Sequence, residues 1–198
     1  AVKFAAHVKG MEVPYHDPLA FVSMAINYAT ASRGACHLES LTYWMGYGIR
    51  IPELYTPEPF DPHSSQDKAR MVVDFQNYLS TYNALGLCKF IAKSGIGPST
   101  LAEWLNKALG WDITPEEVME TGERLFNLKR LISVRLGVTR EDDTLPYRLL
   151  KEPRPSGGAA GVLPDLELML RDYYELRGWD ETGRPKEETL ARLGLKEL

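Results

Sequence analysis

Hydrophobic side chains recur at helical spacing along most of the chain. The longest such pattern spans residues 67–85 and predicts a helix with one apolar face. That face would carry Met71, Val72, Phe75, Leu79 and Tyr82. Lys68, Arg70 and Asp74 lie elsewhere on this helix, so we expect them on the surface.

Five further helices follow from the same spacing and from capping residues. Asp17 precedes Pro18 and is expected to cap the first of them. Residues 114–117, Thr-Pro-Glu-Glu, form a capping box with proline at the first helical position. The expected segments run from Pro18 to about Thr30, from Ser99 to Gly110, from Thr114 to Gly137, from Pro164 onward, and from about Lys186 to Leu193.

Only the start of the chain alternates as a strand does. Val2, Phe4, Ala6 and Val8 are separated by single residues that include lysine and histidine. No partner strand is evident nearby, which suggests that further sequence lies upstream. Residues 51–66 and about 140–162 are rich in Pro, Asp, Gly and Ser, and the second stretch is expected to be flexible. We therefore predict a mainly α domain over residues 1–198 with a short N-terminal β segment.

Composition narrows the function classes. Hydrophobic residues make up 44% and charged residues 25%, as in globular proteins. With 23 basic and 27 acidic side chains the net charge is −4, so nucleic acid is a poor candidate partner. Two cysteines favour a reducing compartment, and no apolar stretch or leader suggests a membrane. These features predict a cytoplasmic protein.

Residues 30–38, Thr-Ala-Ser-Arg-Gly-Ala-Cys-His-Leu, are the first candidate for chemistry. A helix end running into Arg33 and Gly34 places a guanidinium beside exposed backbone, which suits oxyanions such as phosphate. The same residues also fit a plain helix terminus with a capping glycine and a buried Cys36. Taken alone, this pattern favours the plain terminus.

Residues 83–88, Asn-Ala-Leu-Gly-Leu-Cys, are the second candidate. Gly86 at the end of the long helix leaves room for a bulky group near the thiolate of Cys88. A single cysteine cannot hold a cluster, and taken alone this segment favours a buried small residue in a helix pair. A disulfide between Cys36 and Cys88 conflicts with a reducing compartment.

Four separated segments, in this order and spacing, resemble the aldehyde ferredoxin oxidoreductase family of tungsten-pterin enzymes. The match is to the C-terminal third of the family chain, so the resemblance implies the C-terminal helical domain of a larger multidomain enzyme. The segments are residues 8–12 with 15–18, residues 29–38, residues 83–88, and residues 173–180 with 193–195.

The resemblance implies two cofactors, both of which require upstream domains of the same chain. One is a tungsten bis-pterin seated on a β-rich domain. The other is a 4Fe-4S cluster with three ligands from a Cys-x-x-Cys-x-x-x-Cys segment upstream. Cys88 matches the fourth cluster ligand, and thiolate is the ligand that such a cluster requires. Cys36 matches no cluster position.

Other positions carry over residue by residue. Arg33 and Gly34 match family residues that contact a pterin, and Asn83 and Leu87 match a second pterin-contact motif. His37 matches a histidine near the tungsten centre that is proposed to transfer protons or to polarise the substrate oxygen. Two residues depart from the pattern: Asn83 replaces an aspartate, and Glu39 stands where a basic residue is common. Glu39 is expected to oppose a phosphate contact.

The implied activity is oxidation of a small-molecule aldehyde to a carboxylic acid, with electrons leaving through the cluster to ferredoxin. The chain alone is expected to be inactive. One alternative is a related tungsten-pterin reductase of an aromatic acyl-thioester. Another is a helical interaction module that has lost the cofactor. The resemblance leaves the aldehyde, the choice between tungsten and molybdenum, and homodimer formation open.

Overall fold

The computed structural model describes residues 4–196, and it begins with a small β-hairpin. Strand β1, His7–Val8, pairs antiparallel with β2, Met11–Glu12. The expected strand is therefore shorter than its pattern, and Phe4 is 71% exposed. Val2 lies outside the described residues. The expectation of a distant partner is wrong for β1, because a two-residue turn with positive φ at both positions folds the chain back at once.

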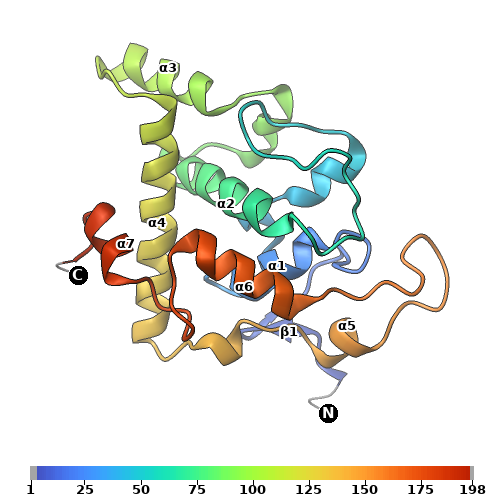
Figure 1. The fold of residues 1–198 in the computed structure, drawn as a ribbon. Helices are drawn as coiled ribbons and strands as arrows, with labels where there is room; N and C mark the ends of the chain where they lie inside the picture. Colours follow the sequence, from blue (N-terminus) through green and yellow to red (C-terminus); the bar gives the residue numbers. More distant parts are fainter. Residues whose placement is uncertain (1–3, 197–198) are drawn as a thin grey trace.

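The long helix α2, Lys68–Leu85, lies at the centre of the molecule (Figure 1). All five residues of its predicted apolar face are buried. Lys68 is buried as well, at 2% exposure, so its predicted surface position is wrong. Its Nζ lies 5.2 Å from the ring centroid of Phe60, because the long loop before α2 folds over this side chain. Other parts of the chain therefore pack against α2 not only on its apolar face but also on sides that carry polar residues.

Helix α4, Pro115–Arg135, is the longest helix of the described chain and crosses α2 (Figure 1). It begins with the predicted capping box: Thr114 Oγ1 accepts from Glu117 N, and a Glu117 carboxylate oxygen accepts from Thr114 N at 2.8 Å. Gly122 faces α2, where a Cβ would overlap the Asn77 carbonyl. The glycine lets the two helix backbones approach closely. Helix α3, Pro98–Leu109, precedes α4 and packs near its start.

Helices α1, Ser23–Thr30, and α6, Leu166–Arg177, also pack against α2. The prediction that α1 begins at Pro18 is wrong, because Val22 N donates instead to Pro62 O at 2.8 Å and residues 18–22 form turns. A buried polar network joins the three helices through Gln76. Its Nε2 lies 3.2 Å from Asn27 Oδ1, and Arg177 donates to its Oε1 at 2.8 Å. The polar atoms of this network are thus paired with one another, as their burial away from water requires.

The segment 140–162 holds two short helices, η5, Arg140–Asp142, and α5, Tyr147–Lys151. Its flexibility remains a prediction. Asp143 within it is fully buried and accepts two hydrogen bonds from Arg130, at 2.7 and 2.8 Å. Lys9 of the hairpin turn pairs with the same carboxylate at 2.7 Å, and Tyr174 donates to it. This buried cluster ties the hairpin to α4 and α6.

The last helix, α7, Glu187–Arg192, packs on α4 through a small separate apolar cluster. The other buried hydrophobic residues form one continuous core around α2. The architecture is mainly α with a two-stranded sheet at the start, as predicted. Short 3-10 helices complete it: η2, His37–Glu39, η3, Thr42–Tyr47, and η4, Lys89–Ser94.

Candidate functional site

The segment after α1, residues 31–39, carries the first group of predicted site residues. Gly34 is buried, with φ +104°, and a Cβ there would overlap the Val8 carbonyl oxygen and approach Met11 Cβ to 2.9 Å. Only glycine allows both the backbone conformation and the close approach of the hairpin. Gly34 therefore has a structural role within the chain. Its predicted pterin contact is a separate property that stays a prediction.

Several other elements hold the same segment. Asn27 Nδ2, on α1, donates to Cys36 O at 3.0 Å, and Ser133 Oγ, on α4, donates to Ser32 O at 3.3 Å. Because its backbone is held from α1, α4 and the hairpin, the segment is rigidly placed before any ligand arrives.

Glu39 points into the protein, where it is 5% exposed and pairs with Lys129 of α4 at 3.2 Å. Its charge also acts on Lys89 and Arg33. The expectation that Glu39 opposes an anion at the surface is not supported by this geometry. The carboxylate instead balances the three cations around it, which lowers the energetic cost of gathering them.

The second group of site residues lies at the C-terminal end of α2. Gly86, with φ +67°, stops the helix: its N–H donates to Asn83 O at 3.4 Å, and Leu87 N donates to Tyr82 O at 2.9 Å. This is the Schellman pattern of helix termination. Leu87 packs on the core, whereas Asn83 is exposed. Cys88 follows directly, also exposed, and its thiol has no hydrogen-bond partner in the described part of the chain.

Lys89 joins the two groups. Its Nζ donates to Leu38 O at 2.5 Å, which fixes the end of α2 against η2. The structure thereby brings the segment of Arg33 and His37 next to the segment of Asn83 and Cys88. Sequence reasoning did not single out Lys89, and its only signal was its place beside Cys88.

Arg33 and Cys36 interact within the first segment. The guanidinium is exposed, and its Nη2 lies 2.8 Å from Cys36 Sγ. The other N–H groups of Arg33 have no partner among residues 4–196, so they are available to an anion. Cys36 is 4% exposed, and both cysteines are free thiols.

His37 lies in the same segment as Arg33 and is affected by several nearby charges. Burial lowers its pKa below the usual 6.5, and the positive fields of His16, Arg33 and Lys89 lower it further. An imidazole with a lowered pKa is neutral at pH 7 and is able to accept a proton. The predicted role in proton transfer is compatible with this environment.

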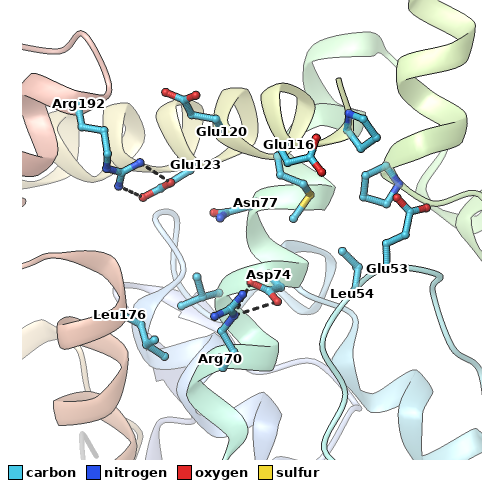
Figure 2. Close-up of a pocket in the computed structure, with 14 residues that line it drawn as sticks. Glu53, Leu54, Arg70, Asp74, Asn77, Glu116, Glu120, Glu123, Leu176 and Arg192 are labelled. Carbon is cyan, nitrogen blue, oxygen red and sulfur yellow. Dashed lines mark hydrogen bonds and ion pairs between the residues drawn. The ribbon is translucent and has the colours of Figure 1, made fainter. Parts of the chain in front are cut away.

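A cavity of about 630 Å³ lies elsewhere, between α2, α3, α4 and α7 (Figure 2). None of the predicted site residues lines it. Figure 2 shows two ion pairs in its wall, Arg70 with Asp74 at 3.0 Å and Arg192 with Glu123 at 2.6 Å. Both arginines that line the cavity are thus paired, so the cavity offers no unpaired guanidinium comparable to that of Arg33.

Two features are absent from the described residues. Within residues 4–196 no three His, Cys, Asp or Glu side chains gather as a metal site. None of the helices described has both the length and the hydropathy needed to cross a bilayer. A cluster bound through Cys88 would need its other ligands from elsewhere, as the sequence resemblance implies.

The chain is similar to known proteins over nearly its whole length. The model of the family described as aldehyde ferredoxin oxidoreductase, domains 2 and 3, matches residues 1–195. The tungsten-containing aldehyde ferredoxin oxidoreductase of Pyrococcus abyssi is 41% identical over 193 residues, which cover 96% of this chain and 31% of that protein. The corresponding protein of Thermococcus kodakarensis is 38% identical over 198 residues, 99% of this chain and 32% of that protein.

More distant similarities extend the comparison. The aliphatic sulfonate oxidoreductase, WOR-like subunit, of Pyrococcus furiosus is 30% identical and covers 98% of this chain and 28% of that protein. A solved structure of the active site complex of benzoyl coenzyme A reductase with 1,5-dienoyl-CoA matches 94% of this chain and 31% of its own, with a TM-score of 0.65 and 19% identity. That match shows a shared fold. The chain spans about a third of the length of the curated relatives it matches.

Proposed function

Because this chain belongs to the aldehyde ferredoxin oxidoreductase family, we propose that it is the C-terminal domain of a tungsten-pterin, iron-sulfur enzyme. The enzyme would oxidise an aldehyde to a carboxylic acid and reduce ferredoxin in the cytoplasm. Upstream domains of the same chain would supply the rest of the cofactor site. The chain alone would be inactive, because the cofactors need those domains.

The observation that carries this proposal is the exposed thiol of Cys88, which has no hydrogen-bond partner among residues 4–196 and lies beside the segment of Arg33 and His37. A thiolate that joins ligands from another domain must lie at the surface, and Cys88 meets that requirement. Cys36 does not meet that requirement, because it is buried and its thiol accepts a hydrogen bond from Arg33. The donor set therefore fits a cluster through Cys88.

The residues around Cys88 also suit a pterin. Arg33 offers exposed N–H donors, and Lys89 adds positive charge beside it. The same pterin would also be contacted by backbone or side-chain atoms of Gly34, Asn83 and Leu87. Asn83 lacks the negative charge of an aspartate but keeps an acceptor oxygen and adds a donor. Arg33 and Asn83 are exposed in the fold as it stands, whereas Gly34 is buried and Leu87 is partly buried against the core.

Within the proposed reaction the protein binds, orients and moves protons. The tungsten-pterin group, when bound, supplies the two-electron oxidation, and the cluster carries the electrons onward. His37, neutral at pH 7, accepts a proton released as water and aldehyde become carboxylate. The ion pair of Glu39 with Lys129 keeps the segment of His37 in place during this transfer.

We propose an aldehyde as the substrate, and not an aromatic acyl-thioester, because the sequence of this chain is more similar to that of an aldehyde oxidoreductase. Identity is 41% to an aldehyde ferredoxin oxidoreductase and 19% to the reductase structure. A cofactor-free helical module is disfavoured by the exposed Cys88 and the free donors of Arg33. An upstream Cys-x-x-Cys-x-x-x-Cys segment in the coding sequence would support the enzyme, and its absence would support the module.

The test compares the two cysteines in the full-length enzyme. We expect Cys88→Ser to abolish or alter the electron paramagnetic resonance signal of the reduced cluster and to remove aldehyde oxidation. Cys36→Ser is the matched control and should keep the cluster signal. Equal loss of the cluster in both variants would overturn the ligand assignment. Metal analysis of the same preparations distinguishes tungsten from molybdenum, and activity of the 198-residue chain alone would contradict the proposed division of the cofactor site.

A further inference from the structure

Two histidines from separate parts of the chain meet at the candidate site. The ring centroids of His16 and His37 are 4.7 Å apart, with the planes inclined by 50°. Tyr43 stacks on His16 at 4.0 Å with an angle of 16°. Tyr28 donates to His16 O at 2.9 Å, which fixes the backbone that carries this ring. His16 belongs to one of the segments that carry the family resemblance, residues 15–18, but the resemblance assigns it no role.

The charged groups around this pair are mostly cationic. Arg33 and Lys89 both act on His37, together with His16. The carboxylates closest to these histidines in sequence each have a cationic partner: Asp17 pairs with Arg154 at 2.8 Å, and Glu39 pairs with Lys129. Neither carboxylate is among the charges that act on His16 or His37. A second positive ring beside the first would therefore be repelled without compensation.

The ring nitrogens of both histidines are free. Neither imidazole has a hydrogen-bond partner in the part of the chain that the structure describes, and both rings are partly exposed. Free nitrogens allow the exchange of a proton with a ligand or with water. His16 thus combines contact with His37, a fixed position on Tyr43, and an unoccupied proton-binding site.

We propose that His16 is a positioning residue for His37 and that the two imidazoles act as one proton-accepting unit, which holds a single proton at a time. The proposal rests on the proposed function, in which His37 takes up a proton. That proton would pass to a ring nitrogen of His37 and then to water, with no change in electron count. The His16 ring would hold the His37 ring in place and prevent a second protonation of the pair.

The direction of the pKa values supports this unit. Burial lowers the pKa of both rings, and for His37 the field of His16 is the next cause. Both are then neutral at pH 7, and protonation of one makes protonation of the other harder. Coupled groups of this kind titrate in two steps that belong to the pair.

The test follows the four histidines of the 198-residue chain by nuclear magnetic resonance titration. In the unchanged chain we expect the ring signals of His16 and His37 each to show two steps at shared pH values. His16→Phe keeps a ring against Tyr43 but removes the charge. In this variant His37 should titrate in one step, at a higher pH than before. His63→Phe is the control, and should leave the His37 curve unchanged.

A second variant keeps the test decisive if the phenylalanine perturbs packing. His16→Gln is also uncharged but lacks the ring, and we expect it to remove the two-step behaviour and to broaden the His37 signals as that ring gains freedom. Single-step titration of His37 in the unchanged chain, or an unchanged His37 curve in both His16 variants, would overturn the proposal.

The experiments distinguish an error in the proposed histidine pair from an error in the proposed function. If His37→Gln in the full-length enzyme leaves aldehyde oxidation intact, the catalytic role of His37 fails while the titration result stands. If the titrations show no coupling while His37→Gln removes activity, His16 loses its role and the proposed function survives. If the pair is correct, His16→Phe should move the acid limb of the kcat profile of the full-length enzyme to higher pH.

Discussion

At the residue scale, the candidate site depends on a few side chains that each tolerate little change. Gly34 allows the hairpin to approach, Glu39 balances nearby cations, and Asp143 anchors the hairpin through Lys9. None of these residues is a reacting group. They place Arg33 and His37, so their loss is expected to appear first in stability.

Replacing Gly34 by alanine should destabilise the chain strongly. The new Cβ would overlap the Val8 carbonyl and hold an L-residue at φ +104°, so we expect a loss of roughly 2 to 4 kcal/mol in the free energy of unfolding. Gly48 also has positive φ, at +75°, but a Cβ there meets nothing within 4 Å. Gly48→Ala should cost only about 1 kcal/mol. Urea denaturation of both variants measures the difference, and equal losses would contradict the close approach.

Replacing Asp143 by asparagine should be as costly. The change leaves the buried guanidinium of Arg130 and the ammonium of Lys9 without their shared counter-charge, which is expected to cost about 3 kcal/mol or more. Glu58→Gln removes an exposed pair with Arg50 at 3.3 Å, and should change stability by less than about 1 kcal/mol. Thermal unfolding followed by circular dichroism compares the two. A small effect of Asp143→Asn would show that the cluster does not anchor the hairpin.

At the scale of elements, the ends of helices position the site more than their lengths do. Helix α2 ends at Gly86, and Asn83 and Cys88 are exposed at this end. Helix α1 ends just before the segment that contains Arg33. Helix α4 supports both, because it presents Lys129 and Ser133 to that segment. The start of α4 sets the register of these contacts along the helix.

Removing the cap of α4 should weaken the whole domain modestly. Thr114→Ala leaves Glu117 N without its side-chain acceptor, and we expect a loss of about 1 kcal/mol in the free energy of unfolding. Glu117→Gln keeps an oxygen that accepts from Thr114 N, so it should retain most of the stability. Urea denaturation again measures both. A larger loss in Glu117→Gln than in Thr114→Ala would show that charge at this terminus matters more than the hydroxyl cap.

At the scale of the molecule, the site lies on a surface that collects cations on a chain with net charge −4. The cations Arg33 and Lys89 lie together with the two neutral histidines at one place, where α2 ends beside η2. This local arrangement is opposite in sign to the chain as a whole. The net charge of the chain therefore does not describe the charge at this site.

The same arrangement predicts how stability depends on pH. His16 and His37 have pKa values below 6.5 in the folded chain, so the unfolded chain binds protons more tightly. The free energy of unfolding should therefore be fully retained above pH 6.5 and should decrease as the pH falls from there toward about 5. The double variant His16→Phe, His37→Phe should show a flatter curve over this range. Urea denaturation at stepped pH checks the slope, and an equal slope in both chains would contradict the lowered pKa values.

Much of the fold could be predicted because it follows from local rules. The apolar stripe of α2, the capping box of α4 and the stop at Gly86 each depend on residues within a few positions of one another. The start of α1 could not be predicted, because the contact of Val22 with Pro62 spans 40 residues of sequence. Lys68 was misplaced for the same reason, since a distant loop buries it.

The candidate site divides in a similar way. Arg33, His37 and Cys88 could be selected by residue type and by resemblance to the family, whereas Lys89, His16 and the buried direction of Glu39 could not. Their importance depends on which side chains become neighbours.

By itself the sequence determined the helical pattern, the family and the residue types available for chemistry, because these depend on periodicity and on the order of motifs. Only the tertiary structure decided which of those groups face one another. It joined the end of α2 to the segment after α1, turned Glu39 inward and set His16 beside His37. The physical reason is that charge, burial and proton affinity depend on distances in space, which separation along the chain does not specify.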